Sequence, residues 1–367
     1  MKAAAGQFKF FDDEGMKEAG EVRAGRHAHA GEGLLDGACA ADAQAALDDQ
    51  DALAYPSEIG SAGQTVVSGA DDDCVPGLGG EVADGDGQAD FAEDCGSYRM
   101  RNPDLCGTPA VKSYEDFTRT GEEVKAKGFT ACKTNIAIEV DGKLRAYRPG
   151  FVVGKGFPER NWDAFIARSA TKTVEAFRKG VGPDVGVMLD TNFHFRTEGF
   201  LRIAEAVGPA KLTWLELDAH DPRSIALIRR DSPCPIASGE TLLERRDFRP
   251  YFENYSFDTA IVDVIWNGFY ESLKIAAMAD VYEVNVAPHN FYGHLASAIS
   301  AHFCAAVPNF RIMEIDIDGV PWRDDIVDHP PTFENGDYVL SNRPGWGVEP
   351  NEAALKARPP KNYVVGM

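Results

Sequence analysis

The sequence lacks the marks of a membrane, secreted or nucleic-acid-binding protein. Its 367 residues include seven cysteines, none in a CxxC pair, and this scatter is typical of free thiols in a reducing compartment. No apolar run approaches the roughly 18 residues of a membrane span, and the first residues lack the apolar core of a secretory signal. The net charge of −21 disfavours nucleic acid as a partner. We therefore expect a cytoplasmic protein with no membrane or nucleic-acid partner.

The first hundred residues are poor in large apolar side chains. They contain 15 Leu, Ile, Val and Phe, and 21 Asp and Glu against 6 Lys and Arg, so −15 of the net charge lies there. Such a composition signals disorder, and no sustained helical or strand period is visible. We expect residues 1–104 to form an atypical, poorly ordered acidic region. A folded cap and a shifted reading frame remain alternatives.

From about residue 104 apolar runs alternate with amphipathic stretches. "SYEDFTRTGEEVKAKG" precedes "FTACKTNIAI", and "NWDAFIARSATKTVEAFRKG" precedes "VGVMLDTN"; the alternation continues to "NFRIMEID". Asp221 before "PRSIALI" is typical of a helix N-cap with Pro222 in the first turn. If "DLCGT" at 104–108 is the first strand, the pattern contains about eight strands. The sequence predicts an α/β fold with a (β/α)8 TIM barrel over residues 105–340, followed by a C-terminal tail over 341–367.

Polar residues end nearly every predicted strand of this barrel. The carboxyl ends of the strands meet at one face, where the chemistry of such barrels is performed. The residues at these ends are Lys133, Asn135, Asp190, Asn192, Glu216, Glu240, Asp263, His289 and Glu314. Such a succession predicts one shared site.

Three of these residues, Asp190, Glu216 and Glu240, are carboxylates on adjacent strands. Oxygen ligands of this kind suit a hard divalent cation, and without one they would raise one another's pKa. Pairing of each with a neighbouring Arg or Lys is the alternative. We predict a Mg²⁺ site formed by the three.

His289 lies one strand after Asp263, in a similar position. A carboxylate bonded to one ring nitrogen fixes the tautomer and makes the other nitrogen a better base. A core histidine with a structural hydrogen bond is the alternative. We favour a catalytic Asp263–His289 dyad.

This set of residues resembles the enolase superfamily, within its mandelate-racemase-like acid-sugar dehydratases. The separations of 26 residues from Asp190 to Glu216 and 24 from Glu216 to Glu240 resemble that family's three Mg²⁺ ligands. The 26 residues from Asp263 to His289 resemble its Asp–His dyad, and "KIAAMADVYEVNVAPHN" and "YVLSNRPGWGVEPNE" also look like this family. The resemblance covers roughly residues 105–360. It implies that Glu314 is an acidic partner on the last strand.

Two strand ends depart from the commonest family patterns. "KTN" at 133–135 is similar to the Lys-x-Asn of galactonate dehydratases, where many members have Lys-x-Lys. Asp190 is followed by Asn192 where those dehydratases often have Asp-x-His, and His194 comes two residues later. The resemblance therefore implies that Asn135 and Asn192 face the substrate, and it makes His194 a candidate acid. The family's N-terminal α+β cap is not recognisable in residues 1–100.

The resemblance implies dehydration of a sugar acid to a 2-keto-3-deoxy acid. Mg²⁺ would stabilise the charge that forms when the proton next to the carboxylate leaves. His289 would take that proton, Lys133 would add positive charge, and His289 or His194 would protonate the departing hydroxyl. A racemase or epimerase of a 2-hydroxy acid, a catalytically impaired barrel without its cap, and another metal-dependent lyase or hydrolase remain alternatives. The expected partner is a small-molecule sugar acid, and a homo-oligomer stays open.

Overall fold

Parallel strands form the central sheet of the protein. The computed structural model describes residues 88–89, 91–94, 99–100, 107–147, 164–316, 318 and 320–358. The sheet has eight strands, in the order β10-β9-β8-β7-β6-β3-β2-β11. Their bounds are β2 (Phe91–Asp94), β3 (Ala131–Asn135), β6 (Gly186–Asp190), β7 (Trp214–Glu216), β8 (Ile236–Ser238), β9 (Thr259–Asp263), β10 (Asn285–His289) and β11 (Met313–Ile315). Every neighbouring pair is parallel.

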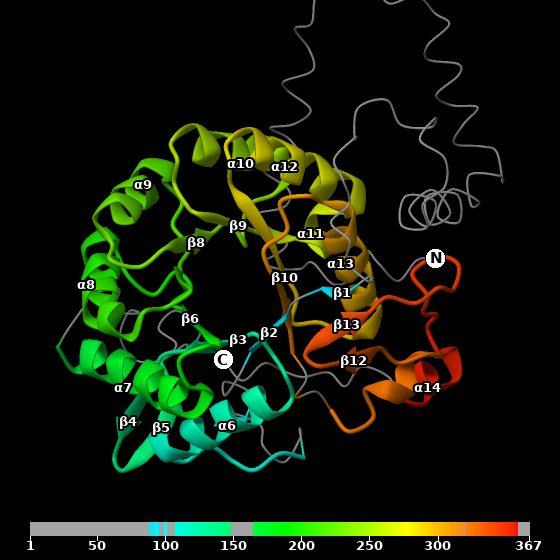
Figure 1. The fold of residues 1–367 in the computed structure, drawn as a ribbon, viewed down its shortest axis with the longest axis horizontal. Coiled ribbons are helices and arrows are strands. Elements are labelled where there is room, and N and C mark those ends of the chain that lie inside the picture. Colours follow the sequence, from blue (N-terminus) through cyan, green and yellow to red (C-terminus); the bar gives the residue numbers. More distant parts are fainter. Residues whose placement is uncertain are drawn as a thin grey trace, which may run out of the picture. The chain divides into compact units, whose positions relative to one another are not determined.

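The sheet curls into a barrel that is surrounded by helices (Figure 1). Val286 in β10 forms a parallel bridge with Phe310, just before β11, so the two ends of the sheet approach each other. The helices between strands are α6 (Tyr114–Ala126), α7 (Ala164–Val181), α8 (Thr197–Val207), α9 (Pro222–Asp231), α10 (Glu244–Glu253), α11 (Val264–Asn267), α12 (Phe269–Val281) and α13 (His294–Ala306). A short 3-10 helix, η4 (Gly208–Ala210), follows α8. The predicted (β/α)8 barrel is confirmed.

The first strand of the barrel is not where the sequence predicted it. Gly107 and Thr108 lie in a turn and a bend, and residues 104–106 lie outside the described residues. The position between β3 and β11 is taken by β2, at residues 91–94. The prediction of a strand at 104–108 is therefore wrong, and the barrel sheet begins within the region assigned to the acidic segment. Residues 1–87 of that segment lie outside the described residues.

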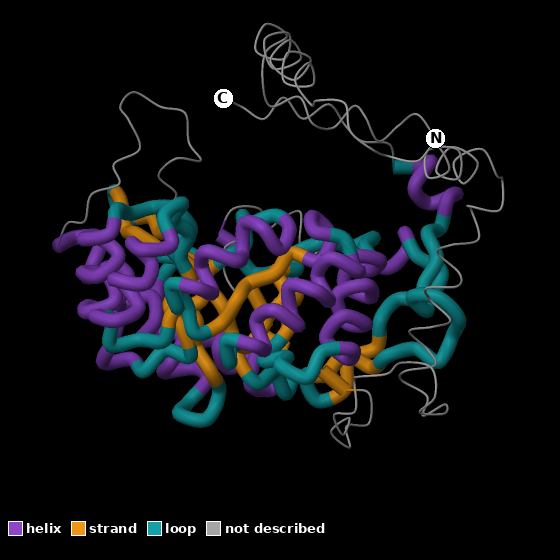
Figure 2. Tube along the Cα trace, turned by 90° about the horizontal axis from the view of Figure 1, so that it is seen from above, coloured by secondary structure: helices purple, strands orange, loops and turns teal. Residues whose placement is uncertain are grey.

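Small antiparallel units lie at both ends of the barrel. At one end, β4 (Ala137–Val140) and β5 (Lys143–Ala146) follow β3 as a hairpin. At the other, β12 (Thr332–Glu334) and β13 (Asp337–Val339) pair with each other and with β1 (Gln88–Ala89). Figure 2 shows these strands at opposite edges of the side view. The 3-10 helix η5 (Asp324–Ile326) and α14 (Glu352–Ala357) complete the described C-terminal part.

A close contact between two glycines fixes the hairpin β12–β13 to the barrel. A Cβ atom at Gly336 would lie 2.3 Å from the carbonyl oxygen of Gly128, and the φ angle of Gly336 is +87°. Only glycine fits a backbone that is both left-handed and this close to another chain segment. Gly128 precedes β3, so the hairpin lies at the amino ends of the strands, opposite the predicted site.

The core lies between the sheet and the helices. Phe117 in α6 and Phe177 in α7 are fully buried, with ring centroids 4.9 Å apart, and this burial of apolar surface stabilises the helix layer. The three cysteines of the described residues, Cys132, Cys234 and Cys304, are buried free thiols. In the described part of the chain no helix has the length and apolar character needed to cross a bilayer.

Candidate active site

Ionisable side chains converge at the carboxyl ends of the strands. Asn135 is paired in register with Asp190, and Asp190 with Glu216. Further round the sheet, His289 is paired with Asp263. Because the strands are parallel, these register pairs place the side chains at one end of the barrel.

Asp190, Glu216 and Glu240 form a carboxylate cluster. One oxygen atom of each lies within 4.8 Å of one oxygen atom of the other two. Burial raises the pKa of Glu216 to about 7 and that of Glu240 to about 8, and the neighbouring carboxylates add to both shifts. Burial also raises the pKa of Asp190. The three ligands of the predicted Mg²⁺ site are thus together, in an environment where their charges oppose one another.

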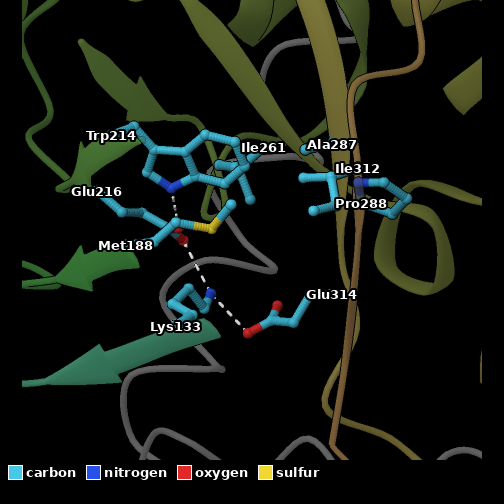
Figure 3. Close-up of a pocket in the computed structure, with 9 residues that line it drawn as sticks. All are labelled: Lys133, Met188, Trp214, Glu216, Ile261, Ala287, Pro288, Ile312 and Glu314. Atoms are coloured by element: carbon cyan, nitrogen blue, oxygen red, sulfur yellow. Dashed lines mark hydrogen bonds and ion pairs between the residues drawn. The ribbon is translucent and has the colours of Figure 1, made fainter. Parts of the chain in front are cut away.

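Two of the three carboxylates are held by neighbouring donors. The backbone N–H of Asn192 donates to Oδ1 of Asp190 at 2.7 Å, and its side-chain amide donates to Oδ2 at 2.9 Å. Lys133 Nζ lies 3.2 Å from Oε1 of Glu216, and the indole N–H of Trp214 donates to Oε2 of Glu216 at 3.1 Å (Figure 3). These contacts orient Asp190 and Glu216 before any ligand arrives.

Lys133 on β3 also pairs with Glu314 on β11, the next strand but one in the sheet. Their Nζ and Oε1 atoms are 2.5 Å apart, and both side chains are buried. Burial acts to raise the pKa of Glu314, but the charges of Lys133 and His289 and the hydrogen bonds from Lys133 and the Asn290 N–H together outweigh it, and the pKa is lowered. A Lys held between Glu216 and Glu314 places one positive charge beside the carboxylate cluster (Figure 3).

Asp263 and His289 form a buried hydrogen-bonded pair. Oδ2 of Asp263 lies 2.7 Å from Nδ1 of His289 and also accepts a hydrogen bond from the Tyr292 hydroxyl. Oδ1 of Asp263 accepts from the backbone N–H of Trp266 at 2.7 Å, because Asp263 is the N-cap of α11. Three donors fix the carboxylate, so it can hold the imidazole in one tautomer.

The other ring nitrogen of His289 faces the carboxylate cluster. Nε2 lies 3.5 Å from Oε1 of Glu240. Burial lowers the pKa of His289, but the hydrogen bond to Asp263 and the charges of Glu314 and Glu240 outweigh it and raise the pKa to about 9. The rings of Trp266 and Phe291, both partly exposed, flank the imidazole with centroids 5.6 and 5.0 Å away.

Two predicted site residues make contacts of another kind. The Asn135 side chain donates to the backbone carbonyl of Asp190 at 3.2 Å, so it braces the end of β6. His194 is buried, with its ring edge-on to Tyr147 and Phe193 at centroid distances of 5.7 Å. Substrate contact by Asn135 and acid catalysis by His194 stay predictions.

The structure adds three residues that the sequence analysis missed. Burial, and then the charge of Glu216, raises the pKa of Asp218 to about 6. The charges of His289 and Lys133 act in the opposite direction and lower it. Trp214 and Asp218 lie two residues before and after Glu216, on the same side of an extended segment, so alternation along "WLELD" could have identified both. No sequence signal points to the bond between Tyr292 and Asp263, because it depends on how the loop after β10 folds back.

Comparison with known families gives the same assignment. Residues 116–354 match the model of the family described as "Enolase C-terminal domain-like". The chain belongs to this family. The barrel is therefore that of the enolase superfamily.

The similar proteins include curated sugar-acid dehydratases and a solved structure whose title names an epimerase. A D-xylonate dehydratase of Haloferax volcanii is 29% identical over 50% of this chain and 45% of its own length. A D-gluconate/D-galactonate dehydratase of Picrophilus torridus is 25% identical over 66% of this chain and 58% of its own. The chain thus spans less than two thirds of these relatives. A solved structure from Burkholderia xenovorans, titled as a putative L-alanine-DL-glutamate epimerase bound to magnesium and fumarate, is 45% identical with a TM-score of 0.73, over 75% of this chain and 68% of that one.

Proposed function

We propose that the protein dehydrates a sugar acid to a 2-keto-3-deoxy acid with Mg²⁺ as cofactor. One observation carries the proposal: the Nε2 atom of His289 faces the carboxylate cluster at 3.5 Å from Glu240, while Nδ1 is held by Asp263 at 2.7 Å. A base beside a cation site suits removal of a proton next to a carboxylate. Curated relatives named as aldonate dehydratases support this reaction class.

The residues of the cluster fit a Mg²⁺ ion. Asp190, Glu216 and Glu240 offer only oxygen donors, which is the set that this hard cation prefers. Their raised pKa values show that the negative charges lack compensation where burial removes water. A bound dication would supply that compensation, and it would also stabilise the charge that develops on the substrate carboxylate.

His289 is the proposed base. Asp263 fixes the proton on Nδ1, so Nε2 carries the lone pair that accepts the proton from C2. The resulting imidazolium is stabilised by the same carboxylate. A cation held by Glu240 would offset the charge of that carboxylate, which is one of the groups that raise the pKa of His289, and would so lower that pKa.

Departure of the 3-hydroxyl completes the reaction. The electron pair left by the C2 proton forms the C2–C3 double bond as the C3–O bond breaks. The imidazolium of His289 returns its proton to the leaving hydroxyl, which departs as water, and the enol product becomes the 2-keto acid. His194 is the alternative acid. Lys133 adds positive charge on the β3 side of the site, beside Glu216 and Glu314.

A second candidate function is epimerisation at C2. The solved structure that is 45% identical carries an epimerase title, and epimerisation needs a base on each face of the carbon. Lys133 on β3 and His289 on β10 would be the two bases. The ion pairs of Lys133 with Glu216 and Glu314 favour the charged ammonium, which cannot accept a proton, so dehydration is the first proposal.

One experiment separates the two reactions. Purified protein with Mg²⁺ is incubated in deuterated buffer with gluconate, galactonate, xylonate and mannonate, and products are followed by proton NMR. Dehydration gives a 2-keto-3-deoxy acid that carries solvent deuterium at C3. Epimerisation gives a 2-hydroxy acid with deuterium at C2 and inverted configuration. The second product without the first would overturn the dehydratase proposal in favour of the epimerase.

A further inference from the structure

A single tryptophan, Trp214, belongs to the apolar layer of the barrel interior next to the carboxylate cluster. The inward-facing layer there has side chains from seven positions: Ala131, Met188, Trp214, Ala237, Ile261, Ala287 and Ile312. Three of the seven are alanines, on β3, β8 and β10, and their small size leaves room for one large ring. Barrel interiors are filled by such layers. The indole of Trp214 lines a small cavity in this layer together with Met188, Ile261, Ala287 and Ile312 (Figure 3).

The indole N–H is aimed at the carboxylate of Glu216. It donates to Oε2 at 3.1 Å, and the exposed fractions of Trp214 and Glu216 are 4% and 3%. An indole has one hydrogen-bond donor and no acceptor. The bond to Glu216 therefore uses the one hydrogen bond that the ring can donate. A hydrogen bond to a buried carboxylate is stronger than one between neutral groups, and it fixes the direction of the acceptor.

The second donor to Glu216 acts differently. Lys133 approaches Oε1 at 3.2 Å, but its positive charge repels a cation at the same carboxylate. The neutral indole N–H orients Glu216 without that repulsion. Groups of this kind, one bond behind a metal ligand, set the ligand's orientation and with it the affinity for the metal.

We propose that Trp214 is a positioning residue of the Mg²⁺ site, which holds the Glu216 carboxylate toward the cation through its indole N–H. The inference rests on the proposed metal site and is independent of the reaction that the site catalyses. The observation that carries the inference is the buried hydrogen bond from the indole N–H to Oε2 of Glu216.

The test is Mg²⁺ affinity, measured by calorimetry with Mg²⁺ alone. Trp214→Phe removes the N–H and keeps an aromatic ring, and we expect it to weaken binding at least about 10-fold, as loss of a bond behind a metal ligand does. Met188→Leu is the matched control, because Met188 belongs to the same layer but donates no hydrogen bond. It should disturb packing and leave the affinity within about twofold of the wild type.

The possible outcomes distinguish failure of the role proposed for Trp214 from failure of the proposed Mg²⁺ site. Equal weakening by Met188→Leu and Trp214→Phe would show that packing alone matters and would overturn the role of the N–H. Unchanged Mg²⁺ affinity in a folded Trp214→Phe protein would overturn it too, while the metal site would stand. A wild-type protein that binds no Mg²⁺ would overturn both.

A second measurement needs no change at Trp214. The sequence has five tryptophans, and Phe variants of Trp162, Trp266, Trp322 and Trp346 assign the remaining indole N–H signal by elimination in ¹⁵N NMR. We expect the Trp214 signal to shift on addition of Mg²⁺ with the midpoint found by calorimetry. A signal that stays in place at saturating Mg²⁺ would contradict the inference even if Trp214→Phe does not fold.

Discussion

Glu240 is a predicted ligand of the proposed metal site. Donors hold Asp190 and Glu216 in place, whereas Glu240 lies near the mouth beside His289 with its side chain 18% exposed. Glu240→Gln keeps the shape but replaces a charged ligand with a neutral one. We expect it to abolish high-affinity Mg²⁺ binding by calorimetry while circular dichroism shows an unchanged barrel. Wild-type affinity in this variant would rule out the assigned site.

The raised pKa values predict how Mg²⁺ binding depends on pH. Protons compete with the cation for Glu216 and Glu240 below their pKa values of about 7 and 8. The imidazolium of His289, with a pKa of about 9, also repels the cation until it loses its proton. Both effects act in the same direction, so apparent affinity should increase from pH 6 to pH 8.5 with release of protons. Calorimetry that gives one affinity across this range would contradict the account.

Asp263 should matter to the reaction through His289. Asp263→Asn removes the negative charge that faces Nδ1 of His289 and replaces one acceptor oxygen with an NH₂ group, which accepts no hydrogen bond, so the three donors to Asp263 are left with one oxygen. We expect exchange of the C2 proton with deuterated solvent to slow about 10²-fold, in the range that a positioned base contributes. Tyr292→Phe is the milder comparison, since it removes one donor and leaves the carboxylate. Parent-rate exchange in Asp263→Asn would show that the base does not depend on this dyad.

At the residue scale, the sequence was enough to identify the polar residues at the carboxyl ends of the strands. Asp190, Glu216 and Glu240 could be grouped because parallel strands bring their ends together whatever the helices between them do. Trp214 was missed, because its use as a donor depends on which way the indole turns inside the barrel. Tyr292 was missed for a similar reason, since a loop decides where its hydroxyl lies.

At the scale of elements, the sequence predicted the start of helix α9 correctly but not the position of the first barrel strand. Asp221 caps α9 as predicted, because its carboxylate accepts from the N–H groups of Arg223 and Ser224, and Pro222 occupies the first turn. The strand β2, "FAED", has too little apolar character to be recognised. Its place is set by pairing with β3 and β11, which are distant in the sequence. Local pattern cannot report such pairing.

The Asp221 cap gives a prediction that is separate from the active site. Asp221→Ala removes the acceptor for two backbone N–H groups at the start of α9, and loss of such a cap costs about 1 kcal/mol of unfolding free energy. Asp221→Ser should retain most of that stability. Urea unfolding measures the difference, and Mg²⁺ affinity should be unchanged in both variants. A loss well above this size would show that Asp221 supports more than its own helix.

At the scale of the molecule, the position of β2 changes the expected boundary of the stable core. Composition predicts that protease removes an acidic N-terminal segment, because residues 1–87 carry little apolar mass. A cut near Asp104 would delete β1 and β2, which pair with β13, β3 and β11. We therefore expect the resistant fragment to begin before Gln88 and to bind Mg²⁺. Mass spectrometry of the fragment identifies its first residue. A stable product that starts near Asp104 would contradict the assigned sheet.

The central claim is that His289 removes the proton next to the carboxylate of a sugar acid at a Mg²⁺ site. The most direct measurement compares the wild type with His289→Asn in deuterated buffer, with the sugar acid and Mg²⁺, by following the C2 proton signal and 2-keto acid formation. Asn keeps a polar group of similar position but has no basic nitrogen. The account predicts that the wild type consumes the C2 proton only when Mg²⁺ is present, and that His289→Asn does not. Loss of the C2 proton at the parent rate in His289→Asn, or in the wild type after the metal is removed, would contradict it.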